Sequence, residues 1–317
     1  MQIEERLDLE QALKAGGLVP DSIAAGNLQR CKVEGDRGGK KSGAYRLFED
    51  AIPTCIWWNW KTSAMGVWVS RGRPLTDIDR NRHRHLIEQA KRERHAEQVA
   101  NWARNGEYLS RLWDSAEVLK AACPAGAYLK RRGLAVPNTD ALRFISKLDY
   151  WDGPELLGAF PAILAAVTDS AGALVNVHRT YLNRDGHKAD VPTVKKLCKS
   201  AGPMRGASIK LGQPDRRPDG RLGLGVAEGI ETALAASILG GIPVWPCVSA
   251  YGLASFEPPQ SVCHLYVFAD NDESGTGQKA AVELGKRAAL RGLTARVLTP
   301  DSVGDWNDEL LARRVAA

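Results

Sequence analysis

The chain has 317 residues, and its 43 Lys and Arg side chains exceed its 37 Asp and Glu side chains, giving a formal net charge of +6. A hydrophobic share of 44% and a charged share of 25% are typical of a globular protein, and this length predicts two or three domains. No apolar run approaches the ~20 residues that cross a bilayer, and the acidic segment 1–6 has no apolar stretch after it, so we expect a cytoplasmic protein without membrane span or secretory signal.

Residues 1–75 predict a small β-rich N-terminal module. An aromatic run at 56–60 is followed by a second strand signal at 66–69, which is typical of a hairpin. Aromatic side chains beside basic groups can stack on single-stranded bases, but a module this small also needs large aromatics for its core. Of its four tryptophans, which include Trp68, we expect one or two to be exposed. The candidates for DNA binding are Trp57, Trp58 and Trp60.

The six cysteines do not indicate a metal or disulfide framework. They are far apart and form no CxxC, which in a cytoplasmic chain is typical of reduced thiols. Cys31 stands where a first zinc ligand could lie, but all six histidines come after position 80, so further ligands would be distant. We expect no zinc, and interpret residues 1–75 as a degenerate module without zinc-ribbon ligands.

Residues 76–122 contain neither proline nor a β-rich run, which predicts a basic helical connector. It is one long helix, or two helices broken near Asn105–Gly106. The stretch 80–94 interleaves Arg, His, Glu and Lys. A solvated face is one interpretation of this stretch, and contact with nucleic acid is the one we favour.

Residues 123–219 predict a basic subdomain of mixed α/β structure. A short helix ends at Gly133, strands are expected at 162–168 and 174–181, and Gly212–Gly220 is the expected linker. His178 suits a core role and a catalytic role equally. Four cations could be surface charges, but their place before the acidic segment favours phosphate ligands: Arg179, Lys188, Lys195 and Lys196.

From residue 220 to 317, short apolar strands alternate with helices, which predicts a parallel sheet covered on both faces. Ligands of such sheets bind beyond the carboxyl ends of the strands. Acidic side chains follow three of the expected strands at that edge, which predicts that they converge. They are Glu228 after strand 222–227, Asp270 and Asp272 after strand 265–269, and Asp305 with Asp308 after strand 295–298.

Carboxylates gathered in this way repel one another unless cations neutralise them. Hard oxygen ligands select Mg²⁺ or Mn²⁺, so we predict that these five residues bind metal. A single such residue would more simply be a helix cap, but three motifs in series favour metal. Residues 220–317 carry eight basic and eleven acidic side chains, and the remainder is therefore +9. This asymmetry could arise by chance. Otherwise it indicates that residues 1–219 bind a polyanion and that residues 220–317 bind metal ions.

Three segments resemble the Toprim fold of bacterial primases, type IA and type II topoisomerases and some nucleases. They are Val226–Leu234, Phe268–Gly275 and Gly304–Asp308. In that family the glutamate acts in acid–base chemistry or metal binding, and the DxD aspartates hold magnesium. The resemblance therefore implies catalytic roles for Glu228, Asp270 and Asp272, and metal binding by these three with Asp305 and Asp308.

The likeness continues upstream, which favours a primase over other Toprim proteins. Within residues 122–312, the segments that resemble the subdomain preceding Toprim in bacterial primases are 128–134, 160–162, 169–172 and 178–181 with the lysines beyond. Residues 229–234, with 30–36 and 41–45, look most like primases carried by conjugative plasmids, integrative elements and phages. There are two departures from replicative primases. Glu231 lies three residues after Glu228, where an aspartate usually lies four after, and the zinc ribbon is absent.

The resemblance implies a DNA primase that makes short RNA primers on single-stranded DNA by two-metal nucleotidyl transfer. Arg179, Lys188, Lys195 and Lys196 would hold nucleotide phosphates, while Arg131, Arg132 and His178 would contact DNA. No GxxxxGK[ST] occurs in the sequence, so a separate helicase or transfer protein is the expected partner. Two alternatives stay open: a Toprim nuclease or strand-cutting enzyme, and a non-catalytic accessory protein of a mobile element that binds single-stranded DNA.

Overall fold

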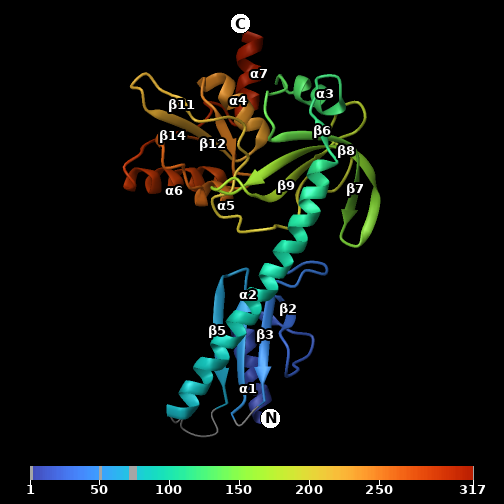
Figure 1. The fold of residues 1–317 in the computed structure, drawn as a ribbon, viewed down its shortest axis with the longest axis vertical. Coiled ribbons are helices and arrows are strands. Elements are labelled where there is room, and N and C mark those ends of the chain that lie inside the picture. Colours follow the sequence, from blue (N-terminus) through green and yellow to red (C-terminus); the bar gives the residue numbers. More distant parts are fainter. Residues whose placement is uncertain (1–2, 50–51, 71–76, 317) are drawn as a thin grey trace. The chain divides into compact units, whose positions relative to one another are not determined.

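The computed structural model describes residues 3–49, 52–70 and 77–316. Contacts within the chain divide it into two compact units, Met1–Ala100 and Asn101–Ala317, shown in Figure 1 and considered separately below. Both helices and sheets are present, and the expected mixed α/β class with a β-rich N-terminal module is confirmed. Among the described helices, none combines the length and the apolar character needed to cross a membrane.

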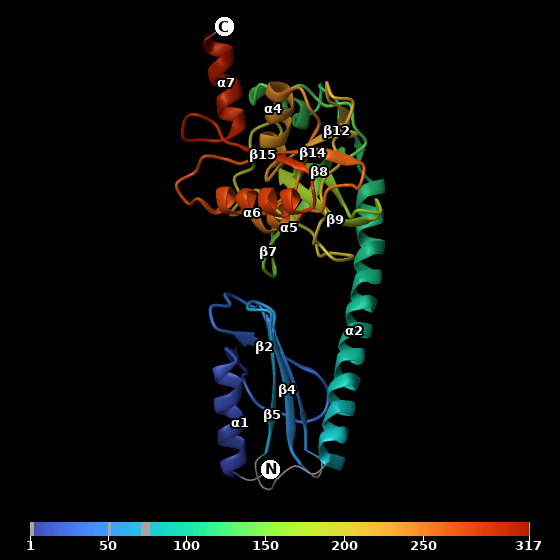
Figure 2. The same ribbon diagram turned by 90° about the vertical axis from the view of Figure 1, so that its left-hand side faces the viewer.

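The first unit is an antiparallel meander between two helices. Its strands pair in chain order as β1 (Leu18–Val19), β2 (Gln29–Val33), β3 (Gly43–Phe48), β4 (Thr54–Asn59) and β5 (Ala64–Val69). Helix α1 (Ile3–Ala15), which the sequence pattern did not reveal, packs Leu9 and Leu13 into the core on one face. Helix α2 covers the other face (Figure 2), where its Ala90 packs against Ile56 and Trp58. Because both faces are covered, β4 is buried along nearly its whole length, with little of the alternation that one-sided burial produces.

Helix α2 (Asp77–Asp114) is one unbroken helix. It passes through the expected break, where the side-chain amide of Asn105 donates to the carbonyl of Ser200 at 2.7 Å. It ends earlier than residue 122, and Leu109 and Leu112 anchor its last turns in the core of the second unit. The C-terminal part of the helix is therefore fixed by packing, and not by its propensity alone.

The second unit contains a five-stranded antiparallel sheet and a sheet that is mainly parallel. The antiparallel sheet has the order β10-β9-β8-β7-β6, and helix α3 (Pro124–Arg131) packs against β8. The strand expected at 162–168 is the C-terminal half of a longer strand, and the strand expected at 174–181 is present with the expected bounds. The bounds are β6 (Glu117–Val118), β7 (Leu142–Asp152), β8 (Glu155–Thr168), β9 (Leu174–Tyr181) and β10 (Lys195–Leu197).

The parallel sheet confirms the alternation of strands and helices after residue 220. Strand β12 pairs in parallel with β13 and β14, β14 pairs in parallel with β15, and β11 pairs antiparallel with β12. The strands are β11 (Asp215–Arg216), β12 (Leu222–Ala227), β13 (Val244–Pro246), β14 (Val262–Phe268) and β15 (Thr294–Leu298). The helices are α4 (Ile230–Gly240), α5 (Ala250–Ser255), α6 (Thr276–Leu290) and α7 (Trp306–Ala316).

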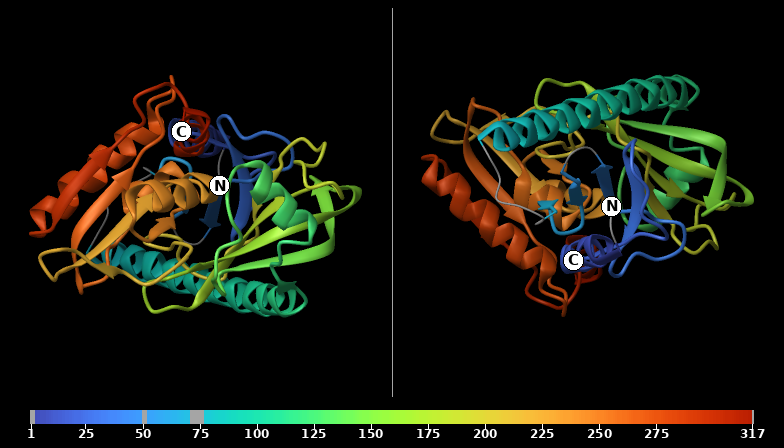
Figure 3. Two further views of the ribbon diagram at one scale, coloured as in Figure 1. Left: turned by 90° about the horizontal axis from the view of Figure 1, so that it is seen from above. Right: turned by 90° about the horizontal axis from the view of Figure 1, so that it is seen from below.

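The expected linker at Gly212–Gly220 is partly wrong, because β11 within it forms an edge strand of the parallel sheet. The two sheets are also joined by one hydrophobic core. Phe144 and Ile163 of the antiparallel sheet belong to the same buried cluster as Ile230 and Ala233 of α4. Figure 3 shows α4 between the green strands and the orange sheet. This core fixes the carboxyl end of β12 against the antiparallel sheet.

Candidate active site

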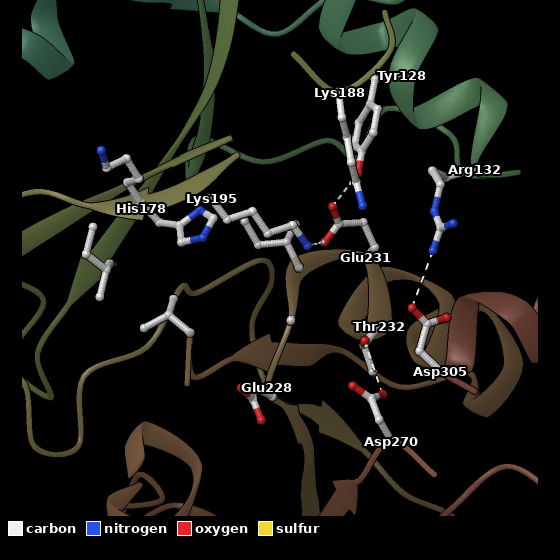
Figure 4. A pocket seen from close by; sticks show the side chains of 15 residues that line it. Tyr128, Arg132, His178, Lys188, Lys195, Glu228, Glu231, Thr232, Asp270 and Asp305 are labelled. Atoms are coloured by element: carbon white, nitrogen blue, oxygen red, sulfur yellow. Dashed lines mark hydrogen bonds and ion pairs between the residues drawn. The ribbon is translucent and has the colours of Figure 1, made fainter. Parts of the chain in front are cut away.

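A cavity of about 420 Å³ lies where the carboxyl ends of the parallel strands meet the antiparallel sheet (Figure 4). One part of its wall comes from the ends of β12 and β14 and the starts of α4 and α7. The other part comes from α3, β9 and β10. Its charged side chains are balanced in number: Glu228, Glu231, Asp270 and Asp305 against Arg132, Lys188, Lys195 and Lys196.

Three of the five predicted metal ligands line this cavity: Glu228, Asp270 and Asp305. Asp272 is exposed outside the lining, where its carboxylate accepts from the Gly275 N–H and the Ser274 hydroxyl, each at 2.9 Å. It thereby closes the turn before α6. The structure thus brings three acids together at the carboxyl ends of the parallel strands, as predicted. Asp272 is instead held in a turn.

Asp308 is also exposed and pairs with Asp305 at the start of α7. Asp305 Oδ1 accepts from the Asp308 N–H at 2.8 Å, and Asp308 Oδ2 accepts from the Asp305 N–H at 3.2 Å. This reciprocal arrangement is a capping box, which satisfies two backbone donors of the helix start. Asp308 therefore serves in the structure as a helix cap, while Asp305 Oδ2 reaches Arg132 Nη2 at 3.4 Å inside the cavity.

Burial and mutual repulsion weaken the acidity of the two central carboxyls. Burial raises the pKa of Asp270 to about 6, with further increases from the charges of Asp305 and Glu228. The Thr232 hydroxyl, which donates to Asp270 Oδ1 at 3.3 Å, opposes this shift. The pKa of Glu228 is raised as well, mainly by burial and then by Asp272. A bound cation would reverse these shifts, because it favours the charged form of each carboxyl.

The chemistry of these donors suits Mg²⁺ or Mn²⁺, which prefer carboxylate oxygens. Across residues 3–49, 52–70 and 77–316, however, no three His, Cys, Asp or Glu side chains are grouped so that they could hold a metal ion. Glu228, Asp270 and Asp305 share a cavity, so rotation of their side chains is the change that metal binding would require.

A buried carboxylate that was not among the predicted site residues connects the two parts of the wall. Glu231 is 5% exposed; its Oε2 accepts from Lys195 Nζ at 2.7 Å, and its Oε1 accepts from the Tyr128 hydroxyl at 2.6 Å. Burial alone would raise the pKa of Glu231, but the charge and hydrogen bond of Lys195 and the bond from Tyr128 outweigh it and lower the pKa to about 2. Figure 4 shows Glu231 turned toward Lys195 and Tyr128.

The register of β9 and β10 sorts the predicted phosphate-binding residues. Lys195 lies opposite Thr180 and Lys196 opposite Arg179, and neighbouring residues of a strand point to opposite faces of a sheet. Lys195 and the exposed Lys188 line the cavity. Lys196 lines the cavity as well, but its Nζ donates to the Trp151 carbonyl at 2.6 Å.

Arg179 lies outside this cavity. Its Nη2 donates to the Leu197 carbonyl at 2.9 Å, and its side chain lines a second groove of about 510 Å³ with Arg111 and Lys147. Two exposed aromatics that the sequence pattern did not single out, Tyr108 and Trp151, line the same groove. The structure therefore places Arg179 outside the cavity that Lys188 and Lys195 line, although Lys196 lies opposite it on the neighbouring strand.

The residues predicted to contact DNA occupy different environments. Arg132 lines the cavity beside Asp305, and the exposed Arg131 donates to the Asp185 carbonyl at 3.1 Å. His178 is a buried part of the cavity wall, and its Nδ1 has no hydrogen-bond partner among the described residues. Burial, followed by the charge of Lys195, lowers the pKa of His178 to about 4. The imidazole is therefore neutral at pH 7 and supplies no cation for a phosphate.

The predicted tryptophans belong to the first unit. Trp58 and Trp68 are buried at 3% and 7% exposure, while Trp57 and Trp60 are half-buried. Trp57 packs over Gly16 and Gly66, where a Cβ would clash with its ring. Trp60 lies beneath the guanidinium of Arg30, 4.0 Å from the ring centroid. Most of this aromatic surface forms the core that a small module requires.

Two family models match separate parts of the second unit. Residues 103–211 match the family model of a domain of unknown function (DUF7146), and residues 223–314 match that of the Toprim domain. The C-terminal segment is a Toprim domain. All four acids that line the cavity lie in this domain: Glu228, Glu231, Asp270 and Asp305. No curated protein matches the sequence.

Several solved structures are similar to the chain at low identity. A DNA primase domain from Pseudomonas aeruginosa has a TM-score of 0.44 at 15% identity, covering 66% of this chain and 74% of that chain. The RNA polymerase domain of Mycobacterium tuberculosis primase DnaG has a TM-score of 0.40 at 17% identity, covering 68% and 79%. The zinc-binding and RNA polymerase domains of Aquifex aeolicus primase have a TM-score of 0.40 at 12% identity, covering 98% and 82%.

Proposed function

We propose that this protein is a DNA primase that makes short RNA primers on a single-stranded DNA template. The observation that carries the proposal is the cavity in which Toprim acids face lysines from the preceding sheet. A polymerase must bind both catalytic metal and a nucleoside triphosphate, whose charge near −4 calls for nearby Lys or Arg side chains. A nuclease needs the acids but has no triphosphate to hold.

The residues of the cavity take the following roles in this proposal. Glu228, Asp270 and Asp305 hold Mg²⁺ or Mn²⁺, and Asp272 joins them if its exposed side chain leaves the turn before α6. When bound, a pair of such ions activates the primer 3′-hydroxyl and neutralises the departing pyrophosphate. Thr232 orients Asp270 through its hydrogen bond.

Lys188 and Lys195 contact the phosphates of the incoming nucleotide, because both line the cavity opposite the acids. Arg179 contacts the template instead, because it lies in the groove with Tyr108 and Trp151. Cations beside exposed aromatics suit single-stranded nucleic acid, whose bases stack while its phosphates pair with charge.

The setting of the reaction is also part of the proposal. It takes place in the cytoplasm, and a separate helicase or transfer protein supplies the unwound template. The proposal that the protein comes from a conjugative plasmid, integrative element or phage rests on the resemblance of residues 30–36, 41–45 and 229–234 alone.

One assay separates this function from its two alternatives. The protein is incubated with end-labelled single-stranded DNA, labelled ribonucleotides and Mg²⁺ or Mn²⁺. A primase yields labelled oligoribonucleotides and leaves the DNA intact. Shortened DNA without RNA products would support a nuclease, and bound but unchanged DNA without products would support an accessory protein. Asp270→Ala is the control, because it must remove the products of any metal-dependent reaction at this site.

A further inference from the structure

The ammonium of Lys195 is fixed by residues from two other elements. Its Nζ, on β10, donates to Glu231 on α4, and Glu231 accepts in turn from Tyr128 on α3. The Lys195 side chain is 41% exposed, whereas that of Glu231 is 7% exposed. The Glu231 carboxylate is therefore buried within the cavity wall, whereas the Lys195 side chain is exposed along the cavity.

The bonds at Lys195 leave room for a ligand. An ammonium has three donors, and within the described residues Glu231 is the one acceptor bonded to Nζ. Two donors thus remain for a phosphate. A free lysine loses rotamer entropy when it is immobilised. A lysine that is already held in place avoids part of that loss when the ligand binds.

The start of α4 directs Glu231 away from the acids. Thr232, the next residue, bonds to Asp270 at 3.3 Å, while both oxygens of Glu231 are engaged by Lys195 and Tyr128. Consecutive residues of a helix point about 100° apart. Thr232 can therefore bond to Asp270 while its neighbour Glu231 bonds to Lys195. Glu231 is thus placed to act on the phosphate side of the cavity.

We propose that Glu231 and Tyr128 are positioning residues that hold Lys195 toward the phosphates of the incoming nucleotide, and that Glu231 is not a metal ligand. This inference rests on the proposed function, which supplies the nucleotide. It assigns Glu231, three residues after Glu228, a role different from that of the Toprim acids.

A double-mutant cycle tests the connection between Glu231 and Lys195. The variants are Glu231→Gln, Lys195→Met and the combination of the two, with Tyr128→Phe as an independent probe. The Michaelis constant for ribonucleotides is measured at saturating template. In parallel, calorimetry gives the Kd of a non-hydrolysable nucleoside triphosphate analogue, a readout that needs no turnover.

We expect Glu231→Gln to raise both constants about tenfold, equivalent to about 1.4 kcal/mol, with kcat changed less than threefold. Tyr128→Phe should raise them about threefold. In the Lys195→Met background, Glu231→Gln should have less than a twofold effect, because residues that act through one another are not additive. Lys199→Ala, which alters an exposed lysine outside both the cavity and the groove, is the matched control and should leave nucleotide binding unchanged.

Three results would overturn the inference. Equal effects of Glu231→Gln with and without Lys195 would remove the coupling. A higher Mg²⁺ requirement at unchanged nucleotide affinity would make Glu231 a metal ligand. A lower melting temperature with unchanged nucleotide constants would leave only a structural role. If the parent protein makes no primers, the proposed function fails, while the calorimetric cycle still decides whether Glu231 acts through Lys195.

Discussion

Burial keeps the Asp270 carboxyl partly protonated near neutral pH, since it raises the pKa to about 6 from an ordinary value of 3.8. Between these values the folded state holds more protons than the unfolded state, so metal-free stability falls as pH rises from about 4 to about 6. Asp270→Asn removes the charge that the fold disfavours. We expect it to raise the melting temperature at pH 7.5 in EDTA by about 2–4 °C, on the order of 1 kcal/mol after screening.

The same scan at pH 4 should show a much smaller gain, because the parent carboxyl is then mainly protonated in the fold. Adding Mg²⁺ should raise the melting temperature of the parent more than that of the variant, since a ligand that binds the folded state stabilises it. Glu273→Gln, which alters an exposed acid nearby, is the control. A gain larger at pH 4 than at pH 7.5 would contradict the proposed charge repulsion.

Lys188 lines the cavity, whereas Arg179 lines the groove. We therefore predict that one substitution affects nucleotide binding and the other affects template binding. Lys188→Ala should raise the ribonucleotide Michaelis constant about three- to tenfold, because one charged contact to phosphate is lost. Template affinity should change little. Arg179→Gln should weaken template binding and leave the nucleotide constant nearly unchanged. Nucleotide titrations at fixed template measure the first effect, and template titrations by fluorescence anisotropy measure the second. A template defect in Lys188→Ala together with a nucleotide defect in Arg179→Gln would contradict this assignment.

At the scale of elements, the turn between β2 and β3 depends on one carboxylate. Asp36 accepts from the N–H groups of Val33 and Ser42 and from the Ser42 hydroxyl, at 3.1, 2.8 and 2.8 Å. Desolvation would raise its pKa, but these bonds outweigh it and lower the pKa to about 2. The unfolded carboxyl has its ordinary pKa near 4, so this contribution to stability is present above pH 4 and lost as pH falls toward 2.

We therefore expect Asp36→Asn to speed hydrogen–deuterium exchange at the Val33 and Ser42 amides at pH 7. In the parent, protection of these amides should decline between pH 4 and pH 2 after correction for intrinsic exchange. Glu34→Gln, a neighbouring exposed acid, should behave like the parent. Unchanged protection in Asp36→Asn would mean that the turn is held by the pairing of β2 with β3 alone.

Sequence reasoning predicted elements whose burial pattern is local. The apolar runs of β12 and β14 lie in a sheet covered on both faces, so each showed as a short continuous hydrophobic stretch. Helix α1 was missed because its residues have little amphipathic pattern, with Leu9 and Leu13 as its buried contacts. The edge strand β11 was assigned to a linker because Pro and Gly surround it, and only its pairing with β12 makes it a strand.

The acidic part of the candidate site was predictable for a topological reason. Parallel strands end at one edge, so Glu228 and Asp270 had to converge once the strands were placed. The contacts across the cavity were not predictable. The Tyr128–Glu231 bond joins residues 103 apart, and the Arg132–Asp305 pair joins residues 173 apart. No local pattern specifies such partners, although the unusual position of Glu231 after Glu228 was a signal that could have been followed.

At the scale of the whole molecule, charge is divided between a basic part and an acidic Toprim domain. The division cannot be tested by cutting the chain at residue 219, because β11 would leave its partner β12 and the core shared with α4 would be opened. Salt dependence of the intact protein is the better test. The affinity for single-stranded DNA should fall with a slope of roughly −0.7 per neutralised phosphate.

Charge substitutions should change this slope in a defined way. Arg179→Gln and Lys147→Gln should each reduce its magnitude by up to ~0.7, since each removes one cation from the groove. Lys279→Gln, on the exposed surface of the Toprim domain, should leave the slope unchanged. A slope that responds only to Lys279→Gln would place the template on the Toprim surface.

The central claim is that synthesis is directed by the template, and sequencing of the RNA products tests it most directly. The parent protein is supplied with all four ribonucleotides, Mg²⁺ or Mn²⁺, and either of two single-stranded DNAs of unrelated sequence. We predict short RNAs complementary to whichever DNA is present, and none from the folded Asp270→Ala variant. RNA of the same sequence on both templates, or DNA fragments in place of RNA, would contradict the account.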